Sequence, residues 1–139
     1  MTNALYLTDK QGVPVIMSSP QSEEYHDIYN IGNAIQSMLD GLTKSHIRTD
    51  GLFLNADVGF DCCTLRAVLE NNGIIDNICI NKRNGTTNSV IIDDLLYHEQ
   101  CSIERTNAWL DSYRTIVNRF DTTVRNWEAW NYIAFAVIL

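Results

Sequence analysis

The apolar run from Gly51 to Ala56 (GLFLNA) constrains the fold of this chain more than any other feature. It is short and continuous, which is typical of a strand buried within a sheet. It leads directly into Asp57-Val58-Gly59, where a glycine allows a sharp turn or the close approach of a ligand. Ligands of open α/β sheets bind at the carboxyl ends of strands. Asp57 is therefore a candidate functional residue, although an Asp here can also simply begin a turn.

The residues that precede this strand predict a β-hairpin and then a helix. Ala4–Thr8 and Val13–Ser18 are short apolar runs, and the polar residues between them end at Gly12, which suits a tight turn. We expect a helix to begin within Gln21–Asp27, with Ser22 as its N-cap. Apolar residues at helical spacing continue that helix until a polar stretch ends it before Gly51.

The residues that follow the strand predict a second helix and a second strand. Asp61 is expected to cap a helix that runs to about Asn71, and Gly73 is expected to terminate it. Asp76–Ile80 reads as a short strand, while Val90–Tyr97 suits either a strand or a helix. From Glu99 the pattern is helical, and after a break we expect a last helix over Val124 to Leu139. The order of elements predicts an α/β sandwich.

Composition bounds the class of protein. With 139 residues, 45% hydrophobic and 19% charged, the chain suits one globular domain. It has no apolar run long enough to span a bilayer and no secretory signal, so we expect no membrane association and a cytoplasmic location. A net charge of −7 argues against an independent DNA-binding module, but it is compatible with a nuclease core whose carboxylates hold metal.

Cysteine and histidine give no sign of a zinc site. The chain has four cysteines but no CxxC pair, and its three histidines are isolated from the cysteines and from one another. We therefore expect reduced, partly buried thiols.

Glu104 is a second candidate functional residue. It lies in a helical pattern, Ser102-Ile103-Glu104-Arg105, in which Ile103 is expected to face the core. That position would place the Glu104 carboxylate near the edge of the sheet. The alternative is a solvated Glu–Arg pair on a helix surface.

Three stretches of the chain carry motifs in a specific order and spacing. They are residues 7–14 with 25–27; residues 55–61 (NADVGFD) with Leu65, Arg66 and Leu69; and residues 103–110 (IERTNAWL) with Tyr97, Tyr113, Arg114 and 118–121 (NRFD). The first resembles the hairpin and following helix of insertion-sequence transposases of the DDE type. The second resembles the motif around that family's second catalytic Asp, and the third the motif around its catalytic Glu. The resemblance covers nearly the whole chain.

The resemblance implies an RNase H-like fold, an α/β architecture in which helices flank a mixed sheet. In that family three carboxylates hold two Mg²⁺ (or Mn²⁺) ions, which activate a water or a 3′-hydroxyl for phosphodiester cleavage and strand transfer at transposon ends. Asp57 and Glu104 match two of these three carboxylates. The resemblance therefore implies that both are catalytic and metal-binding residues, each holding one ion.

The chain also departs from the family pattern. The family's first catalytic Asp lies on the first, central strand, ahead of the hairpin, whereas this sequence opens on the hairpin. We therefore expect residues 1–139 to be a partial catalytic domain, a C-terminal fragment without that strand. Many relatives have an Arg four residues before the Glu and a Lys seven after it, where this chain has Gln100 and Asp111. Arg105, Arg114 and Arg119 remain candidate DNA contacts, or else ordinary solvated charges.

Three functions are compatible with these features. The first is a transposase fragment whose full-length protein binds transposon-end DNA, with little or no activity of its own because the bridging carboxylate is missing. The second is a non-catalytic transposon remnant that folds or oligomerises. A homo-oligomer is compatible with both, because loss of a central strand leaves strand edges unpaired. The third is a related RNase H-like nuclease, or an unrelated α/β binding domain.

Overall fold

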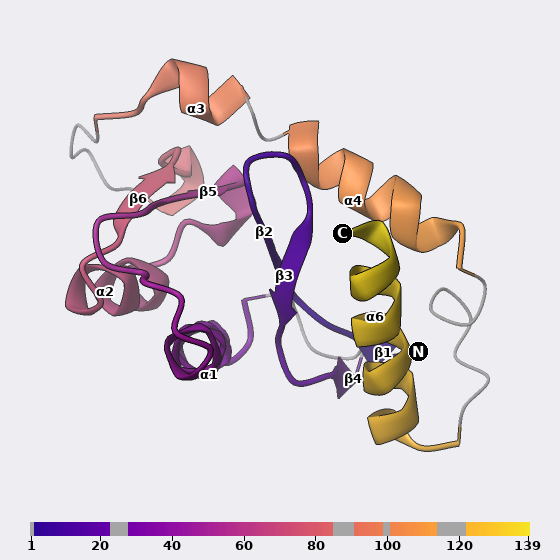
Figure 1. The fold of residues 1–139 in the computed structure, drawn as a ribbon. Coiled ribbons are helices and arrows are strands. Elements are labelled where there is room, and N and C mark those ends of the chain that lie inside the picture. Colours follow the sequence, from indigo (N-terminus) through magenta and orange to yellow (C-terminus); the bar gives the residue numbers. More distant parts are fainter. Residues whose placement is uncertain (1, 23–27, 85–90, 99–100, 114–121) are drawn as a thin grey trace. The chain divides into compact units, whose positions relative to one another are not determined.

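The computed structural model describes residues 2–22, 28–84, 91–98, 101–113 and 122–139. They belong to two compact units (Figure 1). Unit 1 comprises Met1–His26 and Cys101–Leu139, and unit 2 is the continuous segment Asp27–Gln100. Each contains helices and strands, which confirms the mixed α/β class. The described strands form three separate two-stranded sheets. None of the described helices is long and apolar enough to cross a membrane.

The predicted hairpin is present in unit 1. Strand β2 (Tyr6–Thr8) pairs antiparallel with β3 (Pro14–Met17), so that Tyr6 faces Met17. In the connecting loop the Asp9 carboxylate accepts hydrogen bonds from two backbone N–H groups at 2.9 and 2.8 Å. Gly12 has φ 84°, a left-handed conformation that glycine adopts without steric cost. The turn residues therefore act as the sequence predicted.

The predicted start of the first helix is wrong. Gln21–Ser22 forms strand β4, which pairs antiparallel with β1 (Thr2–Asn3), and Ser22 lies opposite Thr2 instead of capping a helix. Helix α1 begins only at Ile31, and residues 23–27 lie outside the described part of the chain. The partner strand is remote in sequence, and such pairing overrides a local helical preference.

Two helices complete the described part of unit 1. They are α4 (Cys101–Asp111) and α6 (Val124–Ile138). The Thr123 hydroxyl accepts a hydrogen bond from Asn126 N at 3.3 Å and so caps α6, whose extent confirms the predicted last helix. The hydrophobic core combines residues of β3 and of both helices: Met17, Leu110, Trp127, Ala134 and Phe135.

A tyrosine links the hairpin to α6. The Tyr6 hydroxyl donates a hydrogen bond to Asn131 Oδ1 at 2.9 Å, and Asn131 Nδ2 donates to the Trp127 carbonyl at 2.9 Å. The Tyr6 ring also meets Phe135 edge-to-face, with centroids 5.8 Å apart. Because it is largely buried, the pKa of Tyr6 is raised to about 12.

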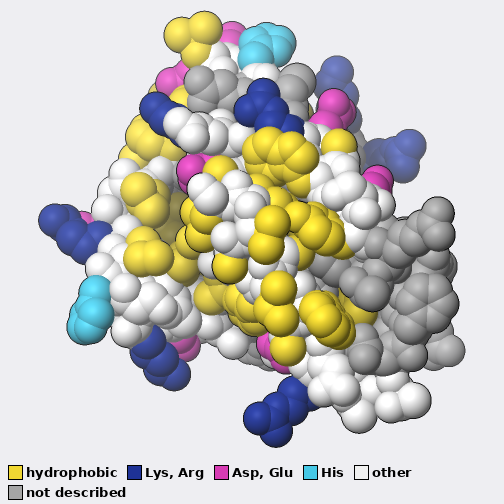
Figure 2. Space-filling view, turned by 45° about the vertical axis from the view of Figure 1, so that its right-hand side comes forward, with side chains coloured by type: hydrophobic (Ala, Val, Ile, Leu, Met, Phe, Trp, Pro, Cys, Tyr) yellow, Lys and Arg dark blue, Asp and Glu magenta, His cyan; other side chains and the backbone are white. Residues whose placement is uncertain are grey.

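Helix α6 is apolar beyond its buried side. Trp130, Ile133 and Val137, spaced three and four residues apart, are 44%, 52% and 67% exposed. In Figure 2 the molecule is turned so that the side of Figure 1 that carries α6 comes forward. Hydrophobic side chains gather on the face shown in this view. Helix α6 therefore carries hydrophobic side chains on both its buried and its exposed sides.

Unit 2 is built around a parallel pair of strands. Its elements in chain order are α1 (Ile31–Lys44), β5 (Phe53–Ala56), the 3-10 helix η1 (Val58–Phe60), α2 (Cys63–Asn71), β6 (Ile75–Ile78), the 3-10 helix η2 (Lys82–Asn84) and α3 (Asp94–His98). Strands β5 and β6 pair in register from Phe53 opposite Ile75 to Ala56 opposite Ile78. Helix α2 makes the connection between them, as a parallel pair requires.

Helices α1 and α2 pack together in unit 2. Gly32 permits their close approach, because a Cβ placed there would lie 2.8 Å from Thr64 Cγ2. Gly73 ends α2 with φ 68°, as predicted. Among the described residues of the unit, the buried hydrophobic ones are Ile31, Ala34, Ile35, Met38, Leu39, Leu42, Leu65, Leu69, Ile74 and Ile78.

Two details of unit 2 differ from the sequence predictions, and the structure decides one alternative that the sequence left open. Strand β5 was expected to be buried, but Phe53 is 52% exposed, because β5 has only one neighbouring strand among the described residues. Asp61 does not cap α2, since Cys62 is the N-cap residue. The ambiguous Val90–Tyr97 segment contributes to helix α3.

Candidate functional site

Asp57 lies at the carboxyl end of β5 and is exposed. One carboxylate oxygen accepts a hydrogen bond from Val58 N at 2.7 Å, and its carbonyl accepts one from Phe60 N at 2.9 Å. These bonds make Asp57 the N-cap of η1, so Asp57 does begin a turn, which is one of the two roles that its sequence position suggested. The bond from Val58 N also holds the exposed carboxylate at the strand end, where a ligand of an α/β sheet would bind.

Gly59 follows two residues later with an unstrained backbone. It is not among the glycines with positive φ, so the sharp turn does not require a glycine. A Cβ built at this position would meet nothing within 4 Å among the described residues. What the glycine provides is open space close to Asp57.

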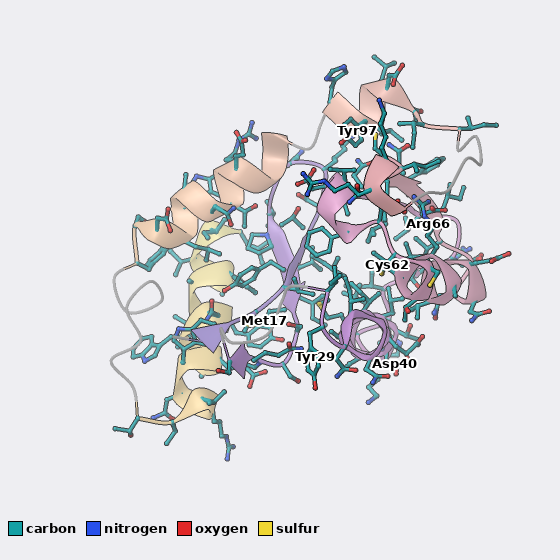
Figure 3. All side chains as sticks on the ribbon, turned by 180° about the vertical axis from the view of Figure 1, so that it is seen from behind. Met17, Tyr29, Asp40, Cys62, Arg66 and Tyr97 are labelled. Carbon is teal, nitrogen blue, oxygen red and sulfur yellow. The ribbon has the colours of Figure 1, made fainter. Side chains whose placement is uncertain are left out.

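A charged network fixes the turn that follows Asp57. Arg66 on α2 (Figure 3) donates to the Asp61 carboxylate at 2.9 Å from Nε and forms ion pairs with Asp61 and Asp76. It also donates to the Ile78 carbonyl at 2.9 Å. Asp61 Oδ2 accepts a hydrogen bond from Asn81 N at 2.7 Å. The side chain of Asp61 is only 8% exposed, so this network ties the end of β5 to the end of β6 from the inside.

A pair of asparagines holds α3 against the strands. Asn55 and Asn77 face each other in the parallel register, and Asn77 Nδ2 donates to Asn55 Oδ1 at 2.7 Å. Asn77 is 2% exposed, and it exchanges hydrogen bonds with the backbone N–H and carbonyl of Asp93. Asn55 Nδ2 donates to the Leu96 carbonyl at 2.9 Å. The sequence signal for this contact was an asparagine in each of the two strands, and it was missed.

Glu104 lies in the first turn of α4 in unit 1, and its side chain is exposed. The next two residues hold the hairpin turn of the same unit. Arg105 Nη1 donates to the Gln11 carbonyl at 3.1 Å, and the buried Thr106 hydroxyl donates to the Gly12 carbonyl. Arg105 thus has a structural contact that sequence reasoning did not foresee, while its role as a DNA contact stays a prediction. Arg114 and Arg119 lie outside the described residues.

Asp57 belongs to unit 2 and Glu104 to unit 1. Both offer the oxygen donors that Mg²⁺ prefers. Within the described ranges, no group of three or more His, Cys, Asp or Glu side chains is placed to hold a metal ion. The described cysteines Cys62, Cys63 and Cys79 are free thiols.

In comparisons with known proteins, no protein-family model, no curated protein and no solved structure matches this chain significantly.

Proposed function

We propose that this chain is part of the catalytic domain of an insertion-sequence DDE transposase, in which Asp57 and Glu104 are two of the three metal-binding carboxylates. The observation that carries the proposal is the position of Asp57. It is exposed at the carboxyl end of a parallel strand pair, and a hydrogen bond from Val58 N holds its carboxylate there. The reaction of the whole enzyme would be metal-dependent phosphodiester cleavage and strand transfer at transposon ends.

The order of elements supports an RNase H-like origin. An antiparallel hairpin is followed by a helix, a strand that ends at an Asp, a crossover helix and a parallel strand. In an RNase H-like sheet, the strand with the first catalytic Asp lies between the hairpin and the strand that corresponds to β5. Among the described residues β5 pairs with β6 alone, which leaves its other edge for such a strand.

Among the described residues, Asp57 and Glu104 have the right donor chemistry for Mg²⁺ or Mn²⁺ but do not make a complete site. A two-ion site needs several carboxylates from separate elements. The described residues supply Asp57 and Glu104 as separate donors and no group of three. We therefore derive no catalytic step for this chain, and we propose that it has little or no activity alone.

Metal binding tests the proposal directly. The Mn²⁺ affinity of the whole chain is measured by electron paramagnetic resonance for the wild type and for Asp57→Asn and Glu104→Gln. We expect each substitution to weaken binding by at least about tenfold, since even the loss of an outer-shell partner has such an effect. Asp40→Asn and Glu70→Gln remove other exposed carboxylates and serve as matched controls. Wild-type Mn²⁺ binding by both site variants would overturn the proposal.

The same proteins separate an enzyme fragment from a non-catalytic remnant. Incubated with supercoiled plasmid and Mg²⁺ or Mn²⁺, the wild-type chain is expected to produce little or no nicked DNA. If nicking occurs, and is abolished by both Asp57→Ala and Glu104→Ala, the chain is an active nuclease fragment instead.

A further inference from the structure

The segment after β6 leaves the sheet at the same edge as Asp57. Strands β5 and β6 are parallel and in register, with Ala56 opposite Ile78, so their carboxyl ends coincide. Helix η1 follows Asp57 at the end of β5, and η2 begins at Lys82, four residues after the last residue of β6. Two short helical turns therefore extend from one edge of this strand pair.

Hydrogen bonds connect these two turns. Asp61, at the end of η1, accepts a hydrogen bond from Asn81 N at 2.7 Å. The Asn81 side-chain oxygen in turn accepts one from Arg83 N at 3.1 Å. Arg66 clamps Asp61 from α2, so the backbone that carries Lys82 and Arg83 is fixed relative to the turn after Asp57.

Lys82 and Arg83 are exposed cations whose side chains have no partner among the residues that the structure describes. Unlike Arg66, neither side chain forms an ion pair with any of the described residues. Cations are scarce in this chain, which has 10 Lys and Arg residues against 17 Asp and Glu. Two adjacent exposed cations, held at the edge that carries a candidate metal-binding carboxylate, suit an extended anion. Part of that anion would lie on the cations while a neighbouring part reaches the carboxylate.

We propose that Lys82 and Arg83 contact backbone phosphates of duplex DNA next to the position of Asp57. This inference rests on the proposed function for the choice of DNA as the anion. Lys supplies a point charge to phosphate, while the planar guanidinium of Arg can bind two phosphate oxygens at once. Such contacts position DNA without reading its sequence.

The test compares charge reversal at two places in unit 2. Binding of a fluorescein-labelled duplex of random sequence to the whole chain is followed by anisotropy over a range of salt concentrations. Lys82→Glu/Arg83→Glu is compared with Lys44→Glu/Arg48→Glu, which reverses two other exposed cations and changes the net charge equally. Lys82→Gln/Arg83→Gln removes the charges without reversing them, and circular dichroism verifies that all variants fold.

We expect the Lys82/Arg83 reversal to weaken binding at least about tenfold at low salt and to lower the salt slope by about 1 per cation. The glutamine variant should lower the slope equally, and the control should stay within about twofold of wild type. Equal weakening by both reversals would show a net-charge effect and would overturn the proposal. So would displacement of the labelled DNA by poly-glutamate as readily as by unlabelled DNA, or absence of DNA binding.

The outcomes also separate this proposal from the proposed function. If Mn²⁺ binding depends on Asp57 but the Lys82/Arg83 reversal leaves DNA affinity unchanged, the metal site stands and the phosphate contact fails. If DNA binding depends on Lys82 and Arg83 but Mn²⁺ binding does not involve Asp57 or Glu104, the phosphate contact stands and the transposase assignment fails.

Discussion

The two units differ in how far apart in the sequence their contacts lie. Unit 2 is one continuous segment, and its central strands are joined by a single crossover helix. Unit 1 combines the two ends of the chain, and the hydrogen bond from Tyr6 to Asn131 spans 125 residues. Local pattern can therefore specify much of unit 2, whereas unit 1 forms only when distant segments meet. Contacts over long sequence separations carry a larger loop-closure cost.

The units also differ in their interior polar groups. Unit 2 contains a charged network around Arg66 and an asparagine pair that anchors α3. Unit 1 contains a neutral link from Tyr6 to Asn131 between aromatic rings. Removal of one partner from a buried charged network costs more than removal of one neutral hydrogen bond, because a desolvated charge remains. Substitutions should therefore affect the two units to different extents.

The largest effect should come from the core of unit 2. Leu69 is fully buried, and Leu69→Ala should lower the free energy of unfolding by about 2–5 kcal/mol, since it removes packed methyl groups and leaves a cavity. All three tryptophans, Trp109, Trp127 and Trp130, lie in unit 1. Tryptophan fluorescence during urea unfolding therefore follows unit 1 alone, while far-ultraviolet circular dichroism follows both units.

If the units unfold independently, Leu69→Ala shifts part of the circular dichroism transition to lower urea and leaves the fluorescence midpoint unchanged. Phe135→Ala in the unit 1 core should instead shift the fluorescence midpoint to lower urea, together with the other part of the circular dichroism transition. Glu70→Ala, an exposed neighbour of Leu69, should change stability by less than about 0.5 kcal/mol. A fluorescence midpoint that moves with Leu69→Ala as far as the circular dichroism does would show one cooperative unit and would contradict the division.

The next largest effect should come from Arg66. Arg66→Leu leaves Asp61 desolvated without its cation and should destabilise unit 2 by about 2–3 kcal/mol. Arg66→Lys keeps the charge but loses the forked geometry, and should lie between the leucine variant and wild type. Arg48→Leu breaks an ion pair with Asp50 whose side chains are 88% and 79% exposed, so it should cost less than about 0.5 kcal/mol.

Circular dichroism during urea unfolding measures these differences. A leucine variant at Arg66 that matches the stability of the Arg48 control would mean that the network contributes no more than a surface ion pair. It would also remove the reason for treating the turn after Asp57 as rigid, and with it the fixed backbone on which Lys82 and Arg83 depend.

The contrast between local contacts and contacts over long sequence separations explains which parts of the fold the sequence could predict. Gly12 and Gly73 mark their turns through a backbone conformation that glycine favours, and such a signal is local. The pairing of Ser22 with Thr2 was missed because nothing near Ser22 announces a distant partner strand. Asp61 was read as a helix cap because local pattern favours that role, but two groups brought close by folding, Arg66 and Asn81, compete for its carboxylate.

In the candidate site, too, features set by local sequence could be predicted, and features set by contacts between distant residues could not. Pattern alone placed Asp57 just past a strand, and the structure confirms that position. The anchoring of α3 by Asn55 and Asn77 depends on a register that pairs them, and a single strand does not reveal a register. Arg105 was read as a solvated or DNA-binding cation because its partner, the Gln11 carbonyl, lies 94 residues away in the sequence. The joint role of Asp57 and Glu104 stays a prediction.

The smallest effect should come from the neutral link in unit 1. Tyr6→Phe keeps the ring contact with Phe135 but leaves the buried Asn131 oxygen without its donor, so it should cost about 1 kcal/mol at neutral pH. Tryptophan fluorescence during urea unfolding measures this loss. Tyr132→Phe is the comparison: its ring also meets Phe135 edge-to-face but is 41% exposed, so loss of its hydroxyl should cost less than loss of the Tyr6 hydroxyl.

Tyr6 should also make unit 1 sensitive to alkali. Burial raises the pKa of Tyr6 from its ordinary 10.0 to about 12, so the folded state retains a proton that the unfolded state has lost in this range. The contribution of Tyr6 to stability is complete below pH 10 and should fall as the pH rises from 10 towards 12. Tyr6→Phe should flatten that decline. Some decline should persist, because desolvation also raises the pKa of Tyr132. An equal decline in wild type and Tyr6→Phe would mean that Tyr6 ionises as easily in the folded chain as in the unfolded one, and so that α6 does not bury it against the hairpin.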